Sequence, residues 1–282
     1  MRFALGLLPH RACLSLTGPD CVDFLDKLIT QSVRDLEIGA LAYGALLSPQ
    51  GKVSADFFIW RSNEGFILDV DSSRLDMLAT RLQRFRLRAQ VDLHAREDVV
   101  PACYDLAAPP GALMAGPDPR LADFGGRALV ARAHALPQAD EVQVLRRRLE
   151  SGLPDLAHDC GPEEVFALEG LLEELNGVSF KKGCFPGQEN VSRMKRRATT
   201  RKKFCRLRFE GPGPAPGTAI LAGGAELGSV RAVCDGIALG FLRLDRAMQA
   251  DGDLLAGGLA CRLDPPAWLI LPRPNEEDET LI

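Results

Sequence analysis

Residues 179–189 read SFKKGCFPGQE, and this is the densest group of chemically useful side chains in the chain. Two glycines and a proline restrict the backbone here, and Lys182 lies close to the thiol of Cys184. A cation near a thiol lowers its pKa and raises its reactivity. Gln188 and Glu189 offer an amide and a carboxylate to a polar heterocycle. The spacing alone is equally compatible with a surface turn that happens to contain a cysteine.

The string K-G-C-F-P-G-Q-E at residues 182–189 resembles the K-G-C-[FY]-x-G-Q-E signature of the YgfZ family. Pro186 and Asn190 depart from the residues usual in that family. The similarity covers nearly the whole chain, and its other parts are the stretches at residues 18–33, 47–56, 82–91, 175–180, 240–244 and 268–269.

The resemblance implies an α+β protein with an aminomethyltransferase-like fold, in which two interlocked α+β lobes and a small C-terminal β-barrel surround a central channel. The lobes would form the folate-binding region at residues 1–200, the barrel would span 201–274, and 275–282 would be an acidic tail. In such a protein the channel accommodates tetrahydrofolate, and the chain assists iron–sulfur cluster assembly or repair. Its partners would be a folate and the assembly proteins or their client enzymes.

The same resemblance suggests site residues. Cys184 would be the reactive thiol. A folate has a polar pterin edge and carboxylates on its tail, so it requires acceptors, an apolar slot and a cation. The residues expected to bind it are Asp56, Glu169, Asn176, Lys182, Gln188, Glu189 and Arg88. Each has a plainer structural interpretation, because a strand end, a helix surface or one of many surface arginines would place the same residue there.

One departure from the aminomethyltransferase pattern concerns catalysis. Those enzymes carry adjacent aspartates in the hairpin beside the folate, and here the matching pair is Ala55 and Asp56. A methyl group cannot position or move a proton. The sequence therefore favours a binding or assembly role, and leaves open the alternative of a folate-dependent one-carbon transferase.

Residue patterns predict the elements independently of any family. Apolar spacing predicts a helix after residues 17–20, a hairpin at 53–60 and 66–70, and a helix opened by Ser73 and Asp76. Residues 140–150 and 163–176 are also expected to be helical, the second ending at Asn176. After Phe204, short apolar runs separated by Gly and Pro predict a small barrel or sandwich.

Composition limits the classes of function. The 282 residues carry a formal net charge of −4, which argues against general nucleic-acid binding. The basic run at 193–203 has no interleaved aromatic residues, so a solvated face is expected, although an acidic partner or RNA would also fit it. The four histidines share no metal-ligand spacing, and the eight cysteines form no C-x-x-C pair, so free thiols are expected. With neither a signal peptide nor an apolar run of about 18 residues, the chain is expected to lie in the cytoplasm.

Overall fold

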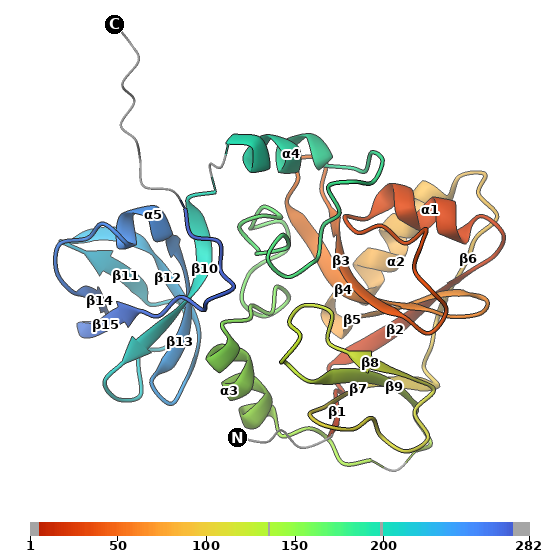
Figure 1. Cartoon of the computed structure of the whole chain (residues 1–282), viewed down its shortest axis with the longest axis horizontal. Helices are drawn as coiled ribbons and strands as arrows, with labels where there is room; N and C mark the ends of the chain where they lie inside the picture. Colours follow the sequence, from red (N-terminus) through yellow and green to blue (C-terminus); the bar gives the residue numbers. More distant parts are fainter. Residues whose placement is uncertain (1–5, 135, 198–199, 273–282) are drawn as a thin grey trace, which may run out of the picture.

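The computed structural model describes residues 6–134, 136–197 and 200–272, arranged as two open sheets and one closed barrel (Figure 1). The first sheet is antiparallel throughout and has the strand order β3-β4-β5-β2-β6. Its strands are β2 (Arg11–Thr17), β3 (Leu41–Leu47), β4 (Val53–Arg61), β5 (Gly65–Asp71) and β6 (Asp92–Ala95). The predicted hairpin is confirmed as β4 and β5.

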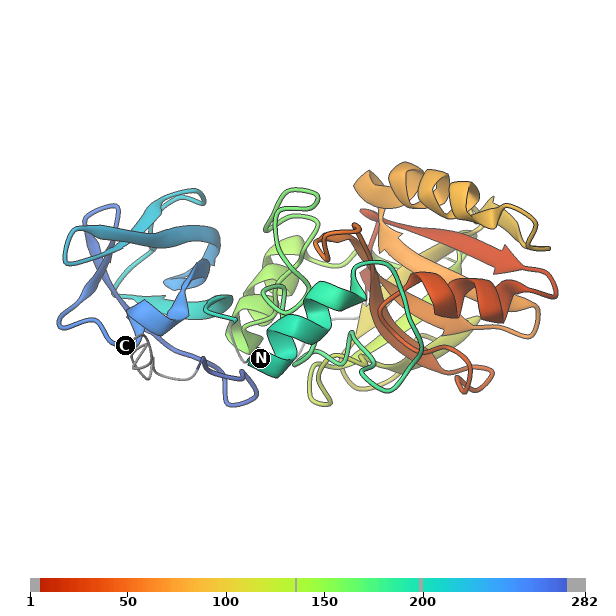
Figure 2. The same ribbon diagram turned by 90° about the horizontal axis from the view of Figure 1, so that it is seen from above.

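Two helices, α1 (Cys21–Leu28) and α2 (Ser72–Arg86), cover one face of this sheet (Figure 2). Both expected helices are present, because their apolar side chains at helical spacing pack on the sheet. The start of α2 differs from the prediction. Asp71, rather than Ser73, caps the helix, since its carboxylate accepts a hydrogen bond from the Ser73 backbone N–H at 2.9 Å.

A second sheet packs against the opposite face of the first. Its order is β1-β7-β9-β8, and its strands are β1 (Gly6–Leu7), β7 (Val99–Tyr104), β8 (Met114–Pro117) and β9 (Gly126–Ala131). Trp60 of the first sheet and Leu129 of the second, both fully buried, meet in the layer between them. Helix α3 (Glu141–Ser151) follows, capped by Asp140 at its start and ended by left-handed Gly152, close to the predicted range.

The segment between α3 and α4 (Gln188–Arg197) contains turns instead of the helix expected over residues 163–176. Leu171 has a left-handed backbone with φ of 62°, which the interior of a helix does not accept, whereas the left-handed Asn176, with φ of 55°, agrees with the end expected there. Tertiary contacts decide this conformation. The Val53 N–H donates to the Val165 carbonyl at 2.9 Å, and Leu171 is fully buried in the core shared by the first sheet and the barrel.

The C-terminal part closes into a six-stranded antiparallel barrel with the order β10-β13-β12-β11-β14-β15, in which β15 pairs with β10. The barrel elements are β10 (Lys202–Phe209), β11 (Ala219–Ala222), β12 (Ala225–Cys234), β13 (Ile237–Arg243), α5 (Leu244–Ala247), β14 (Leu254–Ala256) and β15 (Leu259–Leu263). The expected α+β fold with a C-terminal barrel is confirmed. The expected acidic tail lies outside the described residues.

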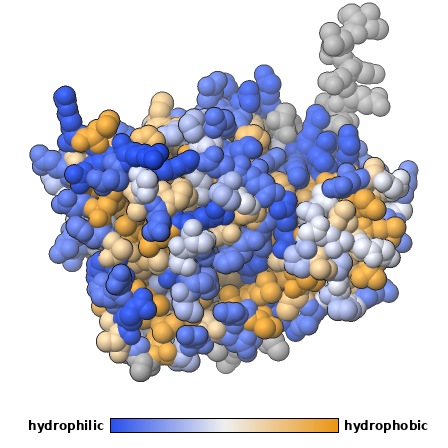
Figure 3. Space-filling model, turned by 180° about the vertical axis from the view of Figure 1, so that it is seen from behind, coloured by the Kyte–Doolittle hydropathy of each residue, from blue (hydrophilic) through white to orange (hydrophobic). Residues whose placement is uncertain are grey.

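The surface shows how the molecule meets its surroundings. On the face seen in Figure 3, hydrophilic residues predominate and hydrophobic ones gather in separate small areas. Among the described residues, no helix is both long and apolar enough to cross a bilayer.

Candidate functional site

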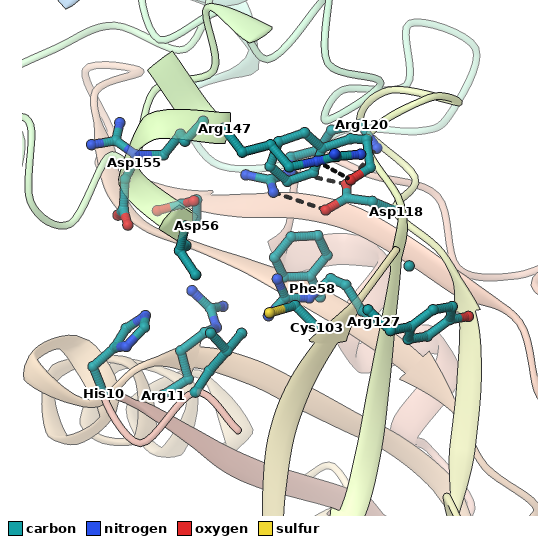
Figure 4. A pocket seen from close by; sticks show the side chains of 16 residues that line it. His10, Arg11, Asp56, Phe58, Cys103, Asp118, Arg120, Arg127, Arg147 and Asp155 are labelled. Atoms are coloured by element: carbon teal, nitrogen blue, oxygen red, sulfur yellow. Dashed lines mark hydrogen bonds and ion pairs between the residues drawn. The ribbon is translucent and has the colours of Figure 1, made fainter. Parts of the chain in front are cut away.

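The best-defined cavity lies between the two sheets and α3 (Figure 4). Its inner chamber has a volume of about 70 Å³. An outer hollow of about 330 Å³ adjoins it, and residues such as His10, Arg148 and Asp155 line both. The residues that line the two spaces come from the lobes between Leu7 and His158, so the barrel, which was expected to help surround a channel, contributes none of them.

Asp56 is the one predicted site residue that lines this chamber. Its Oδ2 accepts a hydrogen bond from the Tyr43 hydroxyl at 2.8 Å. Burial raises the pKa of the Asp56 carboxyl, and the negative charge of Asp155 adds to the effect. The site therefore contains a carboxyl that is easier to protonate than an ordinary aspartate.

The side chain of Ala55 points to the opposite face of the first sheet from that of Asp56. Successive side chains of a strand alternate between the faces of a sheet, and Ala55 is buried beneath the helices that cover the far face. An aspartate at position 55 would thus lie in that apolar core and not in the chamber. The absence of a carboxylate there does not remove an acid from the site, which corrects the argument drawn from the sequence.

A second carboxylate reaches the cavity from a distant segment. Asp155 follows α3 and pairs with His158, whose Nδ1 lies 3.1 Å from the Asp155 Oδ2. That hydrogen bond raises the pKa of His158 to about 9, so the imidazole is protonated at neutral pH. The pattern around Asp155 carries no motif, and sequence reasoning missed it for that reason.

Arginines form the floor of the chamber. The guanidinium carbons of Arg11, Arg120 and Arg127 lie 5.2, 4.8 and 3.7 Å from the centre of the Phe58 ring. Arg11 and Arg127 share one buried partner, Asp69. Such contacts combine ion pairing with cation–π attraction, and they fix the three guanidiniums in place.

Arg120 is held separately. Asp118 accepts two hydrogen bonds from it, at 3.0 Å from Nε and 2.8 Å from Nη2. None of these arginines was a sequence candidate, because they come from three separate segments of an arginine-rich chain.

The signature loop leaves Cys184 exposed. The thiol is not among the groups that line the chamber, so the structure does not bring Cys184 and Asp56 into one cavity. Of the eight cysteines, all in the part of the chain that the structure describes, Cys184 alone is exposed. Burial raises the pKa of Cys160 and Cys205 to about 12 and that of Cys261 to about 11, which keeps those thiols protonated and unreactive.

Lys182 serves the fold rather than a ligand. Its side chain is 1% exposed, and its Nζ donates to the carbonyl oxygens of Ile29 at 2.8 Å and Gln31 at 2.9 Å, and also to that of Asp26. These carbonyls lie in and after the last turn of α1. Lys182 therefore anchors the signature loop to the end of that helix.

We expect Lys182→Met to lower the free energy of unfolding by about 2–3 kcal/mol, because it leaves several buried carbonyl groups without a donor. Urea denaturation measures this. The matched control is Lys181→Met at the exposed neighbouring position, which should change the free energy by less than about 0.5 kcal/mol. Equal effects of the two substitutions would contradict an anchoring role.

The remaining predicted residues are dispersed. Gln188 begins α4, and Glu189 lines a separate groove of about 350 Å³ with Phe166 and Arg193. Glu169 is half-buried and accepts a hydrogen bond from the Phe166 N–H at 2.9 Å. The structure therefore does not gather these residues around Asp56.

Asn176 and Arg88 also lie apart from the chamber lining. Asn176 is exposed, and its Nδ2 donates to the Pro119 carbonyl at 3.1 Å, which fixes the turn before the signature loop. Arg88 is exposed beyond the end of α2. The cavity arginines are better placed than Arg88 to meet an anionic ligand.

The basic run begins on one face of α4. Arg193, Arg196 and Arg197 are three or four residues apart and line a shallow depression together. Within the described ranges no group of three His, Cys, Asp or Glu residues is arranged to hold a metal ion.

Two family models match the chain. Residues 9–100 match the GCVT N-terminal domain, and residues 201–270 match the CAF17 C-terminal beta-barrel domain. The crystal structure of the glycine cleavage system aminomethyltransferase T from Bartonella henselae has a TM-score of 0.76, covering 95% of this chain and 86% of that one. At 16% identity, this likeness shows the shared fold.

Curated relatives are closer in sequence. The iron-sulfur cluster assembly factor IBA57 of Mus musculus is 30% identical over 277 residues, which cover 84% of this chain and 76% of the relative. The Mycosarcoma maydis homolog is 30% identical over 240 residues, which cover 77% of this chain and 60% of the relative. The chain spans 55–60% of the length of three fungal relatives. These relatives are mitochondrial proteins, and this finding overturns the cytoplasmic location expected from the sequence.

Proposed function

The chain belongs to the CAF17/IBA57 family, and from this premise we propose that it is a tetrahydrofolate-binding accessory factor in iron–sulfur cluster assembly or repair. The observation that carries the proposal is the similarity to IBA57 assembly factors over most of the chain. Within the family, the K-G-C-F-P-G-Q-E string supports placement in the YgfZ group.

Cys184 is the group we propose to act on the cluster or its iron. Its exposure on the signature loop, while the other thiols are buried or only partly exposed, supports that role. One thiolate cannot hold a cluster, because iron–sulfur clusters take about four protein ligands. A partner protein or a second copy of the chain would have to supply the rest, and an exposed loop is accessible to either.

Folate is proposed as the ligand of the cavity on the strength of the donor set. Asp56 offers a carboxylate to the amino and imino groups of a pterin edge. In the outer hollow, Arg148 and the protonated His158 offer positive charge to the tail carboxylates. The volume of that hollow, about 330 Å³, lies in the range of small-molecule sites. A bound folate would supply one-carbon chemistry, and the chain would bind it and exclude water.

The folate proposal predicts that Asp56→Asn weakens tetrahydrofolate binding by about tenfold or more, since a hydrogen bond to a charged group contributes about 1.5–3 kcal/mol. Isothermal titration calorimetry of tetrahydrofolate into the native protein and the variant measures this. Asp92→Asn, which removes an exposed carboxylate, is the control and should bind as the native protein does. Equal affinity in Asp56→Asn would remove Asp56 from the site.

The role in assembly is tested by complementation. Cells lacking their own IBA57-type factor should recover the activity of cluster-dependent enzymes when supplied with this chain, while a cluster-free enzyme in the same cells stays unchanged. Failure of a well-expressed, folded chain to restore them would count against the proposal.

Folate-dependent one-carbon transfer is the second candidate. The observation that favours it is Asp155, which places a second carboxylate beside Asp56 despite the alanine at position 55. A pair of acids in different protonation states is what a proton-transfer site requires. Incubation with tetrahydrofolate and aminomethylated compounds should then yield methylene-folate with release of ammonia, and no product from any of them would retire this candidate.

A further inference from the structure

The floor of the chamber has unused hydrogen-bond donors. Arg11, Arg120 and Arg127 line the chamber, and their side chains are 9%, 10% and 6% exposed. In each arginine, Nε and Nη2 donate hydrogen bonds to an aspartate carboxylate or to a carbonyl oxygen. Nη1 of each makes no hydrogen bond to any residue that the structure describes. None of the three is enclosed by protein, so all three amino groups remain available to a ligand in the chamber.

The charges around this floor do not balance. The three arginines carry three positive charges, and their partners Asp69 and Asp118 carry two negative ones. Asp56 and Asp155 are the other carboxylates of the inner chamber; Asp56 is bonded to the Tyr43 hydroxyl and Asp155 is paired with His158, so neither makes a hydrogen bond to a guanidinium of the floor. A buried positive charge without a partner is unfavourable. The chamber therefore holds one further negative charge at a time, which is either an ionised Asp56 or a bound anion.

We propose that the inner chamber is a binding site for a small carboxylate anion, held by Nη1 groups of Arg11, Arg120 and Arg127 above Phe58. Guanidinium groups suit this ligand because they donate in a plane to two oxygens. A volume of about 70 Å³ admits an anion the size of formate or acetate. This site goes beyond the proposed folate function and is separate from it in ligand.

Asp56 makes the site sensitive to pH. An ionised Asp56 neutralises the excess positive charge of the three arginines. When Asp56 is protonated, that charge is available to bind an anion. Burial raises the pKa of Asp56, so a proton is taken up with the anion and binding tightens as the pH falls. Tyr43 is bonded to Asp56, and the other charged or titratable groups of the chamber lining are His10, Arg11, Cys103, Tyr104, Asp118, Arg120, Arg127, Arg147, Arg148 and Asp155.

The effect of His10 must be distinguished from that of Asp56, because protonation of either side chain would favour the binding of an anion. Burial lowers the pKa of His10, which places its protonation at lower pH than that of an ordinary histidine. His10→Gln removes this group and leaves Asp56 in place. If Asp56 is the switch, the pH dependence survives in His10→Gln and disappears in Asp56→Asn.

The test is calorimetric titration of sodium formate into the full-length protein at pH 5.5 and 7.5, with sodium chloride as the reference at equal ionic strength. The native protein should bind formate more tightly at pH 5.5, by up to about tenfold for each pH unit above the pKa of Asp56. Asp56→Asn should bind formate at pH 7.5 more tightly than the native protein does at the same pH. The same substitution is expected to weaken tetrahydrofolate binding, so failure of one proposal is distinguishable from failure of the other.

Arg120→Lys keeps the charge, loses the planar donors and should weaken formate binding at least about tenfold. The matched control is Arg243→Lys in the barrel, because Arg243 makes the same kind of two-bond pair with Asp245, at 2.9 and 2.7 Å. Formate binding no stronger than chloride binding, both in the native protein at pH 5.5 and in Asp56→Asn, would overturn the proposal. Unchanged binding in a folded Arg120→Lys would do the same, and if that variant does not fold, the Asp56→Asn titration decides.

Discussion

Asp69→Asn is expected to lower the free energy of unfolding by about 3–5 kcal/mol. Asp69 is fully buried and accepts hydrogen bonds from both Arg11 and Arg127, which are themselves buried. Burial alone would raise the pKa of Asp69, but the two guanidiniums hold it below its usual value, so the group is ionised in the folded protein. Replacing it by a neutral amide leaves two largely buried positive charges without their shared partner. Denaturation by urea, followed by circular dichroism, measures the loss.

The control for this experiment is an exposed pair of the same kind. Arg96 and Asp98 are joined at 2.7 Å, and the Asp98 side chain is 65% exposed. Asp98→Asn should change the free energy of unfolding by no more than about 1 kcal/mol, because water and salt screen exposed pairs. A loss below about 1 kcal/mol in Asp69→Asn would mean that the arginines of the chamber floor do not depend on their shared partner.

Cys184→Ala is expected to reduce the recovery of cluster-dependent enzymes at least about tenfold in the complementation experiment, since alanine offers no ligand for iron and no nucleophile. The thiol is exposed and occupies no core position, so the fold should tolerate the change within about 0.5 kcal/mol. Activities of one cluster-dependent and one cluster-free enzyme, with the amount of the variant protein, are the readouts.

Cys234 provides the comparison, because it is the partly exposed thiol at the end of β12, in the barrel. Cys234→Ala should complement as the native chain does. Full recovery of enzyme activity with Cys184→Ala would exclude this thiol from the mechanism, whatever its exposure.

Local patterns in the sequence predicted the elements whose packing is simple. Helix α1 follows from the spacing of its apolar residues, because it buries one face against the first sheet. The β4–β5 hairpin is buried on both faces, and it was found as two apolar runs joined by a turn. The segment at 163–176 has helix-forming residues but a different structure. Its leucines at positions 168, 171, 172 and 175 are all buried in one core, and Leu171 has a left-handed backbone that no local pattern predicts.

The cavity was predictable only in part. Asp56 was found because it lies in a stretch that resembles a known hairpin. Arg120, Arg127 and Asp155 could not be found in the same way, since each comes from a different segment and no motif connects them. Their meeting depends on how the second sheet and α3 dock on the first sheet, which is a tertiary property.

The signature loop illustrates the difference between a motif and its roles. The sequence treated Lys182 and Cys184 as partners in one reactive group. In the structure the ammonium group of Lys182 turns inward to the end of α1, while Cys184 is presented to solvent. A buried anchor next to an exposed thiol holds the thiol at a fixed place on the surface, which a partner protein can use.

The most direct test of the central claim is incorporation of radioactive iron (⁵⁵Fe) into a cluster-dependent enzyme in cells that lack their own IBA57-type factor. With the native chain, the iron recovered with the immunoprecipitated enzyme should return to the level of unmodified cells, and with Cys184→Ala it should stay near that of cells given an empty vector. Equal incorporation with and without the native chain, at matched amounts of the enzyme, would contradict a role in cluster assembly.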